Sequence, residues 1–333
     1  MLKYCLTIVM FALGVFATTA QTHAKNDFTW GINGHPLTKT DYNGNLTEQI
    51  NTIKDLKLSS YRFDVLLDTK GYAKNESRFS SLLKILKKNA ISPLPTVMQS
   101  GFKDMDISAI YDIAYKQGSN FASTYGEYLS VIEVGNEGDN KTILSAKVDG
   151  TNASHYNIVK ARRLLTATKG FIDGLKSIKP EVRVTLSFSW IHFYYLQMLK
   201  EFNVNYDIIG YHWYSNMGDI TNARSYGNVL TLVSKRFNKP IWITEFNYFK
   251  GTTIVNFARQ NQYITNSLQK ILSQGIISGF FIYELYDQPA LKRRYSTEAC
   301  YGLIYKDSTG NYNKKEAYLG YKQLVEKYMS SSF

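Results

Sequence analysis

The sequence contains 333 residues, of which 44% are hydrophobic, 14% are aromatic and 20% are charged. With six prolines and two cysteines, this composition excludes an intrinsically disordered chain, a collagen-like repeat and a disulfide-stapled scaffold. The formal net charge of +12 would suit a nucleic-acid partner. However, the lysines are spread along predicted helices and no zinc-finger, RNP or basic-zipper pattern occurs, so we expect no nucleic-acid partner.

The first 24 residues have the layout of a secretory signal peptide. Lys3 supplies a positive charge, Leu6–Phe16 is almost wholly apolar, and small residues lead to Ala24 at a suitable cleavage position. An N-terminal membrane anchor is the alternative, but this apolar run is shorter than the roughly 20 residues that a span requires. We therefore expect a signal peptide over residues 1–24. The mature domain over 25–333 is then secreted or periplasmic, with no membrane attachment after cleavage.

Short runs rich in β-forming residues alternate along the chain with segments of helical periodicity. The predicted strands are Phe28–Asn33, Tyr61–Val65, Leu94–Met98, Val131–Val134, Val182–Phe188, Asp207–Trp213, Ile241–Phe246 and Gly279–Leu285. The predicted helices cover about 46–57, 75–89, 107–126, 153–177, 191–202, 222–236, 254–274 and 314–328. The strands read as continuous apolar runs, as expected when both faces are buried. This order predicts an α/β fold, a single (β/α)8 TIM barrel.

A doubly wound open sheet is the alternative architecture. That fold usually carries a Gly-rich phosphate loop of the form G-x-G-x-x-G after its first strand, where this chain reads GINGHP. No Pro-rich or Ser-rich linker interrupts the pattern, so we expect no second domain.

Two glutamates stand at the carboxyl ends of predicted strands, where a barrel holds its active site. Glu137 follows the fourth strand through Gly135 and Asn136, and Glu245 closes the apolar run Ile241–Thr244. A carboxylate at the end of a buried strand costs energy unless it is paired or used. Enzymes that hydrolyse glycosides use two carboxyl groups that face each other, as these would across a barrel mouth. One donates a proton and the other attacks the anomeric carbon.

The segments VIEVGNEGD, IIGYHWYS and IWITEFN resemble the fourth, sixth and seventh strands of the clan A retaining glycoside hydrolases, which are (β/α)8 barrels. The resemblance implies that Glu137 is the acid/base and Glu245 the nucleophile, while Asn136 contacts the substrate 2-hydroxyl. It also implies that Tyr214 and Arg62 support Glu245, and that His212 belongs to the same His-x-Tyr pattern. One departure is that many clan members end strand eight in Trp, where this chain has Tyr283.

Further polar and aromatic residues are candidates for contact with sugar, most with a structural alternative. Asn33 and His35 end the first strand, and His35, like His212, could equally be a satisfied core histidine. Trp190 and Tyr283 could stack on a sugar ring or be plain core. Glu284 could bind sugar or hydrogen-bond the backbone near Pro289. Glu133, on the fourth strand, is expected near the barrel bottom or paired with a helix lysine.

We therefore expect a secreted, monomeric, retaining glycoside hydrolase that cleaves β-linked polysaccharide or oligosaccharide. A β-glucan-type substrate and endo action are favoured, in a cleft walled by the loops after strands three and four. The histidines are scattered and no H-E-x-x-H occurs, so we expect neither metal nor cofactor. Two alternatives remain open: a non-catalytic carbohydrate-binding barrel, and a cell-wall transglycosylase that uses the same two glutamates.

Overall fold

The computed structural model describes residues 28–330, and the predicted signal peptide lies outside these described residues. Within them, eight parallel strands close into one barrel in sequence order. Their bounds are β1 Thr29–Gly34, β2 Ser60–Leu66, β3 Ser92–Met98, β4 Val131–Val134, β5 Arg183–Ser189, β6 Ile208–Tyr214, β7 Ile241–Asn247 and β8 Ile277–Ile282. The predicted (β/α)8 barrel is therefore confirmed.

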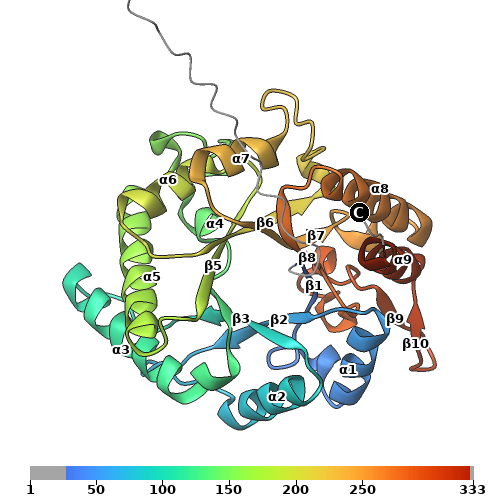
Figure 1. Ribbon diagram of the computed structural model, residues 1–333, viewed down its shortest axis with the longest axis horizontal. Coiled ribbons are helices and arrows are strands. Elements are labelled where there is room, and N and C mark those ends of the chain that lie inside the picture. The colour runs from blue at the N-terminus through green and yellow to red at the C-terminus, as the bar shows by residue number, and fades with distance from the viewer. Residues whose placement is uncertain (1–27, 331–333) are drawn as a thin grey trace, which may run out of the picture.

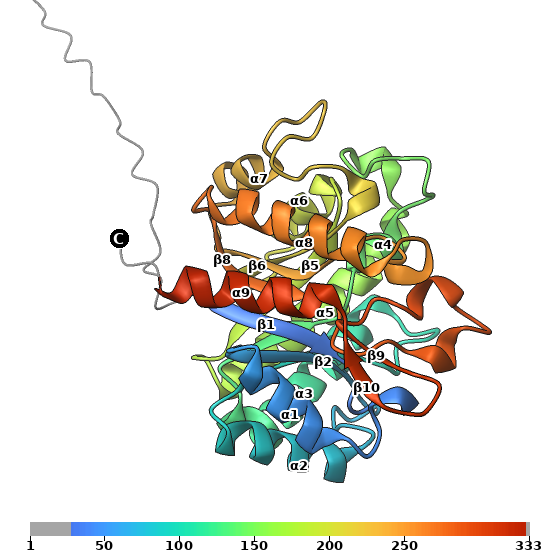
Figure 2. The same ribbon diagram turned by 90° about the vertical axis from the view of Figure 1, so that its right-hand side faces the viewer.

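Helices surround the barrel as an outer ring (Figure 1). They are α1 Leu46–Asp55, α2 Glu76–Lys88, α3 Ile107–Tyr125, α4 Gly138–Thr142, α5 Ile158–Ile178, α6 Phe193–Glu201, α7 Val229–Phe237, α8 Phe257–Leu272 and α9 Glu316–Ser330. In both views α9 lies beside α8, where it completes the ring next to β8 and β1 (Figures 1 and 2). The longer helices bury an apolar stripe against the barrel, as Phe79, Leu82, Leu83 and Leu86 of α2 illustrate.

Two described elements do not follow from the sequence pattern. The short helix α4 is only five residues long, which is too short for helical periodicity to reveal. The hairpin of β9 (Ile304–Lys306) and β10 (Tyr312–Lys314) lies in the connection between β8 and α9. Strand β8 also ends three residues before its predicted end at Leu285, because the chain leaves the barrel there and enters this connection.

The connection from β8 to α9 is long and irregular. It contains the 3-10 turns Pro289–Leu291 and Ser296–Glu298 before the β9–β10 hairpin. Backbone hydrogen bonds from Leu303 to Glu284 and from Ile304 to Leu285 fold it back on itself. This connection therefore forms a fixed wall at the carboxyl end of the barrel. Over the described residues, no helix is long and apolar enough to cross a membrane.

Candidate active site

The register between β6 and β7 places two functional side chains opposite each other. Tyr211 pairs with Ile243, but the register then shifts so that His212 pairs with Glu245. Such an irregularity re-aims side chains and is common next to active sites. His212 and Tyr214 are two residues apart on one strand, so they share a face of the sheet. As a result, Tyr214 donates a hydrogen bond of 2.6 Å to Oε2 of Glu245.

The backbone after β4 turns sharply to present Glu137. Gly135 has a φ of 73° and Glu137 a φ of 45°, both in the left-handed region. Glycine adopts this conformation freely, whereas a residue with a Cβ loses roughly 1–2 kcal/mol. The Glu137 N–H donates to Oγ of Ser187 on β5, which holds the turn in place. Glu137 thus stands at the start of α4 with its side chain over the barrel mouth.

Asp139 anchors the same turn from below. It is fully buried, and its Oδ2 accepts hydrogen bonds from the backbone N–H and the hydroxyl of Ser189. The ring of His192 lies 2.5 Å from the same oxygen. These contacts tie α4 to the end of β5, so they fix the backbone from which Glu137 projects.

Arg62 of β2 lies at the centre of the site. Its Nη1 is 2.7 Å from Oε1 of Glu245 and also donates to Oδ1 of Asn33. Its Nε and Nη2 each donate at 2.7 Å to the two oxygens of Glu133, and Nη2 also donates to Asn136. The expectation that Glu133 pairs with a helix lysine is therefore wrong. Its position on β4 turns it into the barrel, where Arg62 balances its charge.

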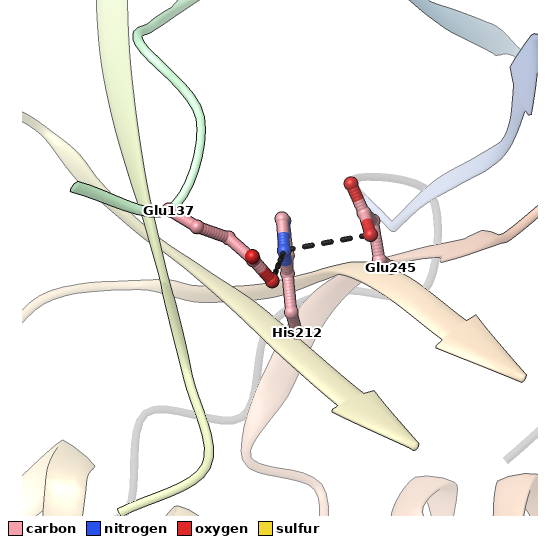
Figure 3. A group of neighbouring side chains, drawn as sticks. All are labelled: Glu137, His212 and Glu245. Carbon is pink, nitrogen blue, oxygen red and sulfur yellow. Dashed lines mark hydrogen bonds and ion pairs between the residues drawn. The ribbon is translucent and has the colours of Figure 1, made fainter. Parts of the chain in front are cut away.

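His212 lies between the two predicted catalytic glutamates, as Figure 3 shows. Its Nδ1 is 2.9 Å from Oε1 of Glu137 and 3.5 Å from Oε2 of Glu245. One side-chain oxygen of each glutamate and the imidazole nitrogen all lie within 4.8 Å of one another. The Glu137 side chain is 26% exposed and that of Glu245 only 9%, so Glu137 is the more accessible of the two.

The buried charges shift the pKa values of this group. Burial opposes a charge on His212, but the carboxylates of Glu245 and Glu137 outweigh it and raise the His212 pKa. Burial alone would raise the pKa of Glu137, but the hydrogen bond and charge of His212 lower it below its ordinary value. Burial and the charge of Glu245 raise the pKa of Tyr214 well above its usual range. Tyr214 therefore stays protonated and acts as a donor to Glu245.

The same three side chains have the composition of a metal site. Glu137, His212 and Glu245 could each offer one ligand atom. However, the Arg62 guanidinium already contacts Glu245 at 2.7 Å, and a divalent cation bound there would face this fixed positive charge. These residues are therefore better suited to hold a pair of carboxylates in place than to bind a metal ion.

An open cavity of about 700 Å³ lies over this group. Its volume falls within the range of small-molecule sites. Its lining includes Arg62, Asn136, Glu137, Tyr214 and Glu245 from the predicted set. The opposite wall comes from the β8–α9 connection and from the segment after β1, contributing Thr38, Lys39, Gln288, Leu291, Tyr295, Glu298 and Tyr301. Of the two loops expected to form walls, the one after β4 contributes Asn136 and Glu137 to this cavity, whereas the loop after β3 contributes no lining residue in the described part of the chain.

The remaining predicted residues divide into those that reach the cavity and those that lie behind it. His35 and Tyr283 line it, and His35 forms a 2.7 Å contact with Asp64. Glu284 is fully buried and accepts hydrogen bonds from Tyr42 and Gln288, so it supports the wall instead of facing a sugar.

Three further predicted residues are also absent from the lining. His212 and Asn33 are buried beneath the catalytic pair and act through Glu137, Glu245 and Arg62. Trp190 follows β5, beside His192, and does not reach the cavity.

Glu298 is a cavity residue that the sequence pattern did not reveal, because it stands in an aperiodic stretch after β8, the last strand of the barrel. Its carboxylate forms no ion pair or side-chain hydrogen bond within residues 28–330. Burial, and then the charges of Glu284, Glu245 and Glu137, raise its pKa to about 7. A fourth carboxylate therefore lines the cavity, beside Asp64, Glu137 and Glu245.

The raised pKa of Glu298 makes stability depend on pH. Its pKa is about 7 in the folded protein and about 4.5 ordinarily, so the folded state binds this proton more tightly. The contribution of Glu298 to stability therefore falls as the pH rises from 4.5 to about 7. We expect Glu298→Gln to raise the thermal midpoint relative to wild type at pH 8 but much less at pH 4.5. Thermal unfolding at both pH values checks this, with Glu326→Gln on α9 as an exposed control. An equal difference at both pH values would contradict the assignment.

A closed (β/α)8 barrel with two glutamates, an arginine and a tyrosine at its carboxyl end defines the class of carbohydrate-cleaving barrel enzymes. In agreement, residues 116–299 match the family model described as glycosyl hydrolase catalytic core. This match covers just over half of the chain and includes both glutamates, so the protein belongs to this glycosyl hydrolase family. No curated protein matches significantly.

Solved structures share the fold at low sequence identity. The family 1 β-glucosidase from Thermotoga maritima superposes with a TM-score of 0.67 and 14% identity, covering 91% of this chain and 98% of that one. The β-glycosidase BGL167 superposes with a TM-score of 0.62 and 14% identity, covering 92% of this chain and 98% of that one. At this identity the likeness concerns the barrel itself.

Proposed function

We propose that this glycosyl hydrolase cleaves β-glycosidic bonds with retention of configuration. The observation that carries the proposal is the approach of a Glu137 oxygen to within 4.8 Å of a Glu245 oxygen. Retaining enzymes hold their carboxyl groups about 5–5.5 Å apart, whereas inverting enzymes need roughly 6.5–9.5 Å to admit a water. The β specificity is supported by the strand-end pattern that this chain shares with clan A enzymes.

In the first step Glu245 attacks the anomeric carbon and the bond to the leaving oxygen breaks. Arg62 and Tyr214 each hold one Glu245 oxygen, at 2.7 Å and 2.6 Å, so the carboxylate is oriented for attack. Glu137 gives a proton to the leaving oxygen. The nearest proton store is Nδ1 of His212, 2.9 Å from Glu137. A sugar in the cavity excludes water from Glu137, which strengthens the effect of burial and favours its neutral form.

In the second step a water enters as the leaving group departs. Glu137, now ionised, takes a proton from this water, which attacks the anomeric carbon of the glycosyl-enzyme. The bond to Glu245 breaks and its carboxylate returns to Arg62 and Tyr214. Two inversions at one carbon restore the original configuration.

The cavity supports action on a polymer that crosses the barrel mouth. A neighbouring cavity of about 410 Å³, lined by Tyr248, Phe249 and Tyr263, shares Asn216 and Phe249 with the catalytic one. On the other side a cavity of about 320 Å³ shares Met98 with it. Three adjoining hollows favour an extended groove, hence endo action on a polysaccharide. The N-terminal sequence favours secretion, which would bring the enzyme to such a polymer.

The test is a reducing-end assay on β-glucans, mannan, galactan and xylan, followed by proton NMR of the first product formed. We expect one polymer to be cut, with the β-anomer appearing before mutarotation. Initial appearance of the α-anomer would contradict retention. Products longer than the substrate would instead identify a transglycosylase. Heat stabilisation by a glycan that is never cleaved would identify a binding protein.

A further inference from the structure

The cavity that shares Met98 with the catalytic site has a distinct chemical character. It lies between the ends of β3 and β4 and is covered by α4 and α5. Its lining includes Gly135, two residues before Glu137, and Lys141, four residues after it. Because Glu137 protonates the leaving oxygen in the proposed mechanism, this cavity lies on the leaving-group side of the scissile bond.

The lining combines an apolar floor with positive charge. Met98, Phe102, Ile110, Leu164 and Ala167 supply apolar surface, which suits the C–H faces of a sugar ring. Three cations, Lys141, Lys160 and Arg163, stand around it, and no Asp or Glu lines it. The catalytic cavity next to it has four carboxylates in its lining. The two halves of the groove therefore differ in charge.

Among the described residues the cations of this second cavity form no ion pair with a carboxylate, although Lys141 feels the charges of Glu137 and Asp139. Within residues 28–330 no ion pair engages Lys141, Lys160 or Arg163. Elsewhere on the same helix α5, Lys169 is 2.7 Å from Asp173 and Lys176 is 2.7 Å from Asp207. Within the described residues, Lys160 and Arg163 therefore lack the ion pairs that two other lysines of this helix form.

The wall of this cavity is held in shape by Arg163. Its Nη1 donates to the carbonyl of Met105 and its Nη2 to the carbonyl of Phe102, at 2.6 and 2.9 Å. These bonds fasten the loop after β3 to α5. These hydrogen bonds therefore fix the shape of the cavity, and the remaining charges, on Lys141 and Lys160, are available to bind a ligand.

We propose that this cavity is a subsite for an anionic sugar residue, bearing a carboxylate or a sulfate, on the leaving-group side of the bond that is cut. The ring lies on the apolar floor, and the acidic group meets Lys141 and Lys160 through charge-assisted hydrogen bonds. This inference rests on the proposed function and names the substrate class of the same groove. The catalytic cavity carries both negative and positive side chains, so we assign an uncharged sugar to the position at the scissile bond.

The test compares kcat/KM for a neutral β-glycan, for its carboxymethylated form and for its sulfated form at matched ionic strength. For wild type we expect the ratio of kcat/KM for an anionic substrate to kcat/KM for the neutral substrate to exceed one. The acidic group that gives this ratio, carboxylate or sulfate, is the one that the subsite fits. In Lys141→Gln/Lys160→Gln this ratio should fall about tenfold, the scale of lost hydrogen bonds to a charged group. The control Lys200→Gln/Lys235→Gln changes the net charge equally on α6 and α7 and should preserve the ratio.

An equal fall in both double variants would show that the net charge alone attracts acidic polymers, and would overturn the subsite. So would a wild-type ratio at or below one for both acidic substrates. The dissociation constants of the same three glycans for Glu245→Gln provide a readout without turnover. If no glycan is cleaved, the proposed function fails, and these constants in the lysine double variant still decide whether the cavity binds anions.

Discussion

We expect Glu245→Gln to lower kcat/KM by roughly 10⁴-fold or more, because a neutral amide cannot form the glycosyl-enzyme. Folding should survive this change. Arg62 retains its two contacts of 2.7 Å with Glu133, so no buried charge is left without a partner. The hydroxyl of Tyr214 can still donate to the amide oxygen. Steady-state kinetics and a thermal midpoint close to that of wild type are the measurements that check this.

The smaller variant Glu245→Ala offers a chemical check on the same role. It leaves a space beside the Arg62 guanidinium that fits a small anion such as azide. Azide should restore turnover of an activated aryl β-glycoside and yield the α-glycosyl azide, since it attacks from the side of the missing carboxylate.

Glu298→Gln makes the same replacement as Glu245→Gln in the same cavity, and we expect it to change kcat by less than about tenfold. Full activity in Glu245→Gln would refute the mechanism.

Glu137→Ala has an effect that depends on the leaving group. For a sugar leaving group we expect a loss of about 10²–10⁴-fold, the usual contribution of a general acid or base. A dinitrophenolate needs no proton to depart, so its release should remain fast and the glycosyl-enzyme should accumulate as a burst. Azide should then give the β-glycosyl azide, because it attacks the intermediate from the side opposite Glu245. Stopped-flow absorbance and product NMR measure both results.

The two azide products distinguish the roles of the glutamates. If Glu137 were merely a structural cap of α4, its removal would slow all leaving groups equally. If the roles were exchanged, the α-azide would come from the Glu137 variant. The side-chain distances do not by themselves determine which azide product each variant gives. The two experiments therefore test the assigned roles of Glu137 and Glu245 independently of the geometry.

The guanidinium of Arg62 supports the site electrostatically and also holds strands of the barrel together. The guanidinium joins β1, β2, β4 and β7 through Asn33, Glu133, Asn136 and Glu245. Removing one member of such a buried network leaves others without partners. Residues of this network should therefore be less tolerant of substitution than the exposed wall residues of the β8–α9 connection.

Much of the site could be predicted because its residues stand at strand ends. Glu137, His212, Tyr214 and Glu245 follow or close apolar runs, and parallel strands bring their carboxyl ends to one edge. The hydrophobic pattern locates the strands, so it also locates these four residues. Arg62, the third residue of β2, was identified instead through the resemblance to the clan A enzymes.

The sequence by itself determined the eight strand–helix units and the two glutamates, since both follow from the local alternation of apolar and polar residues. Only the tertiary structure decided that Glu133 pairs with Arg62 and that Glu284 lies behind the wall, because strand tilt and register set which side chains meet inside a closed barrel. It alone brought Glu298 and Lys39 to the cavity and placed Lys160 beside Met98. Such contacts join segments far apart in the chain through aperiodic loops, for which a single sequence carries no repeating signal.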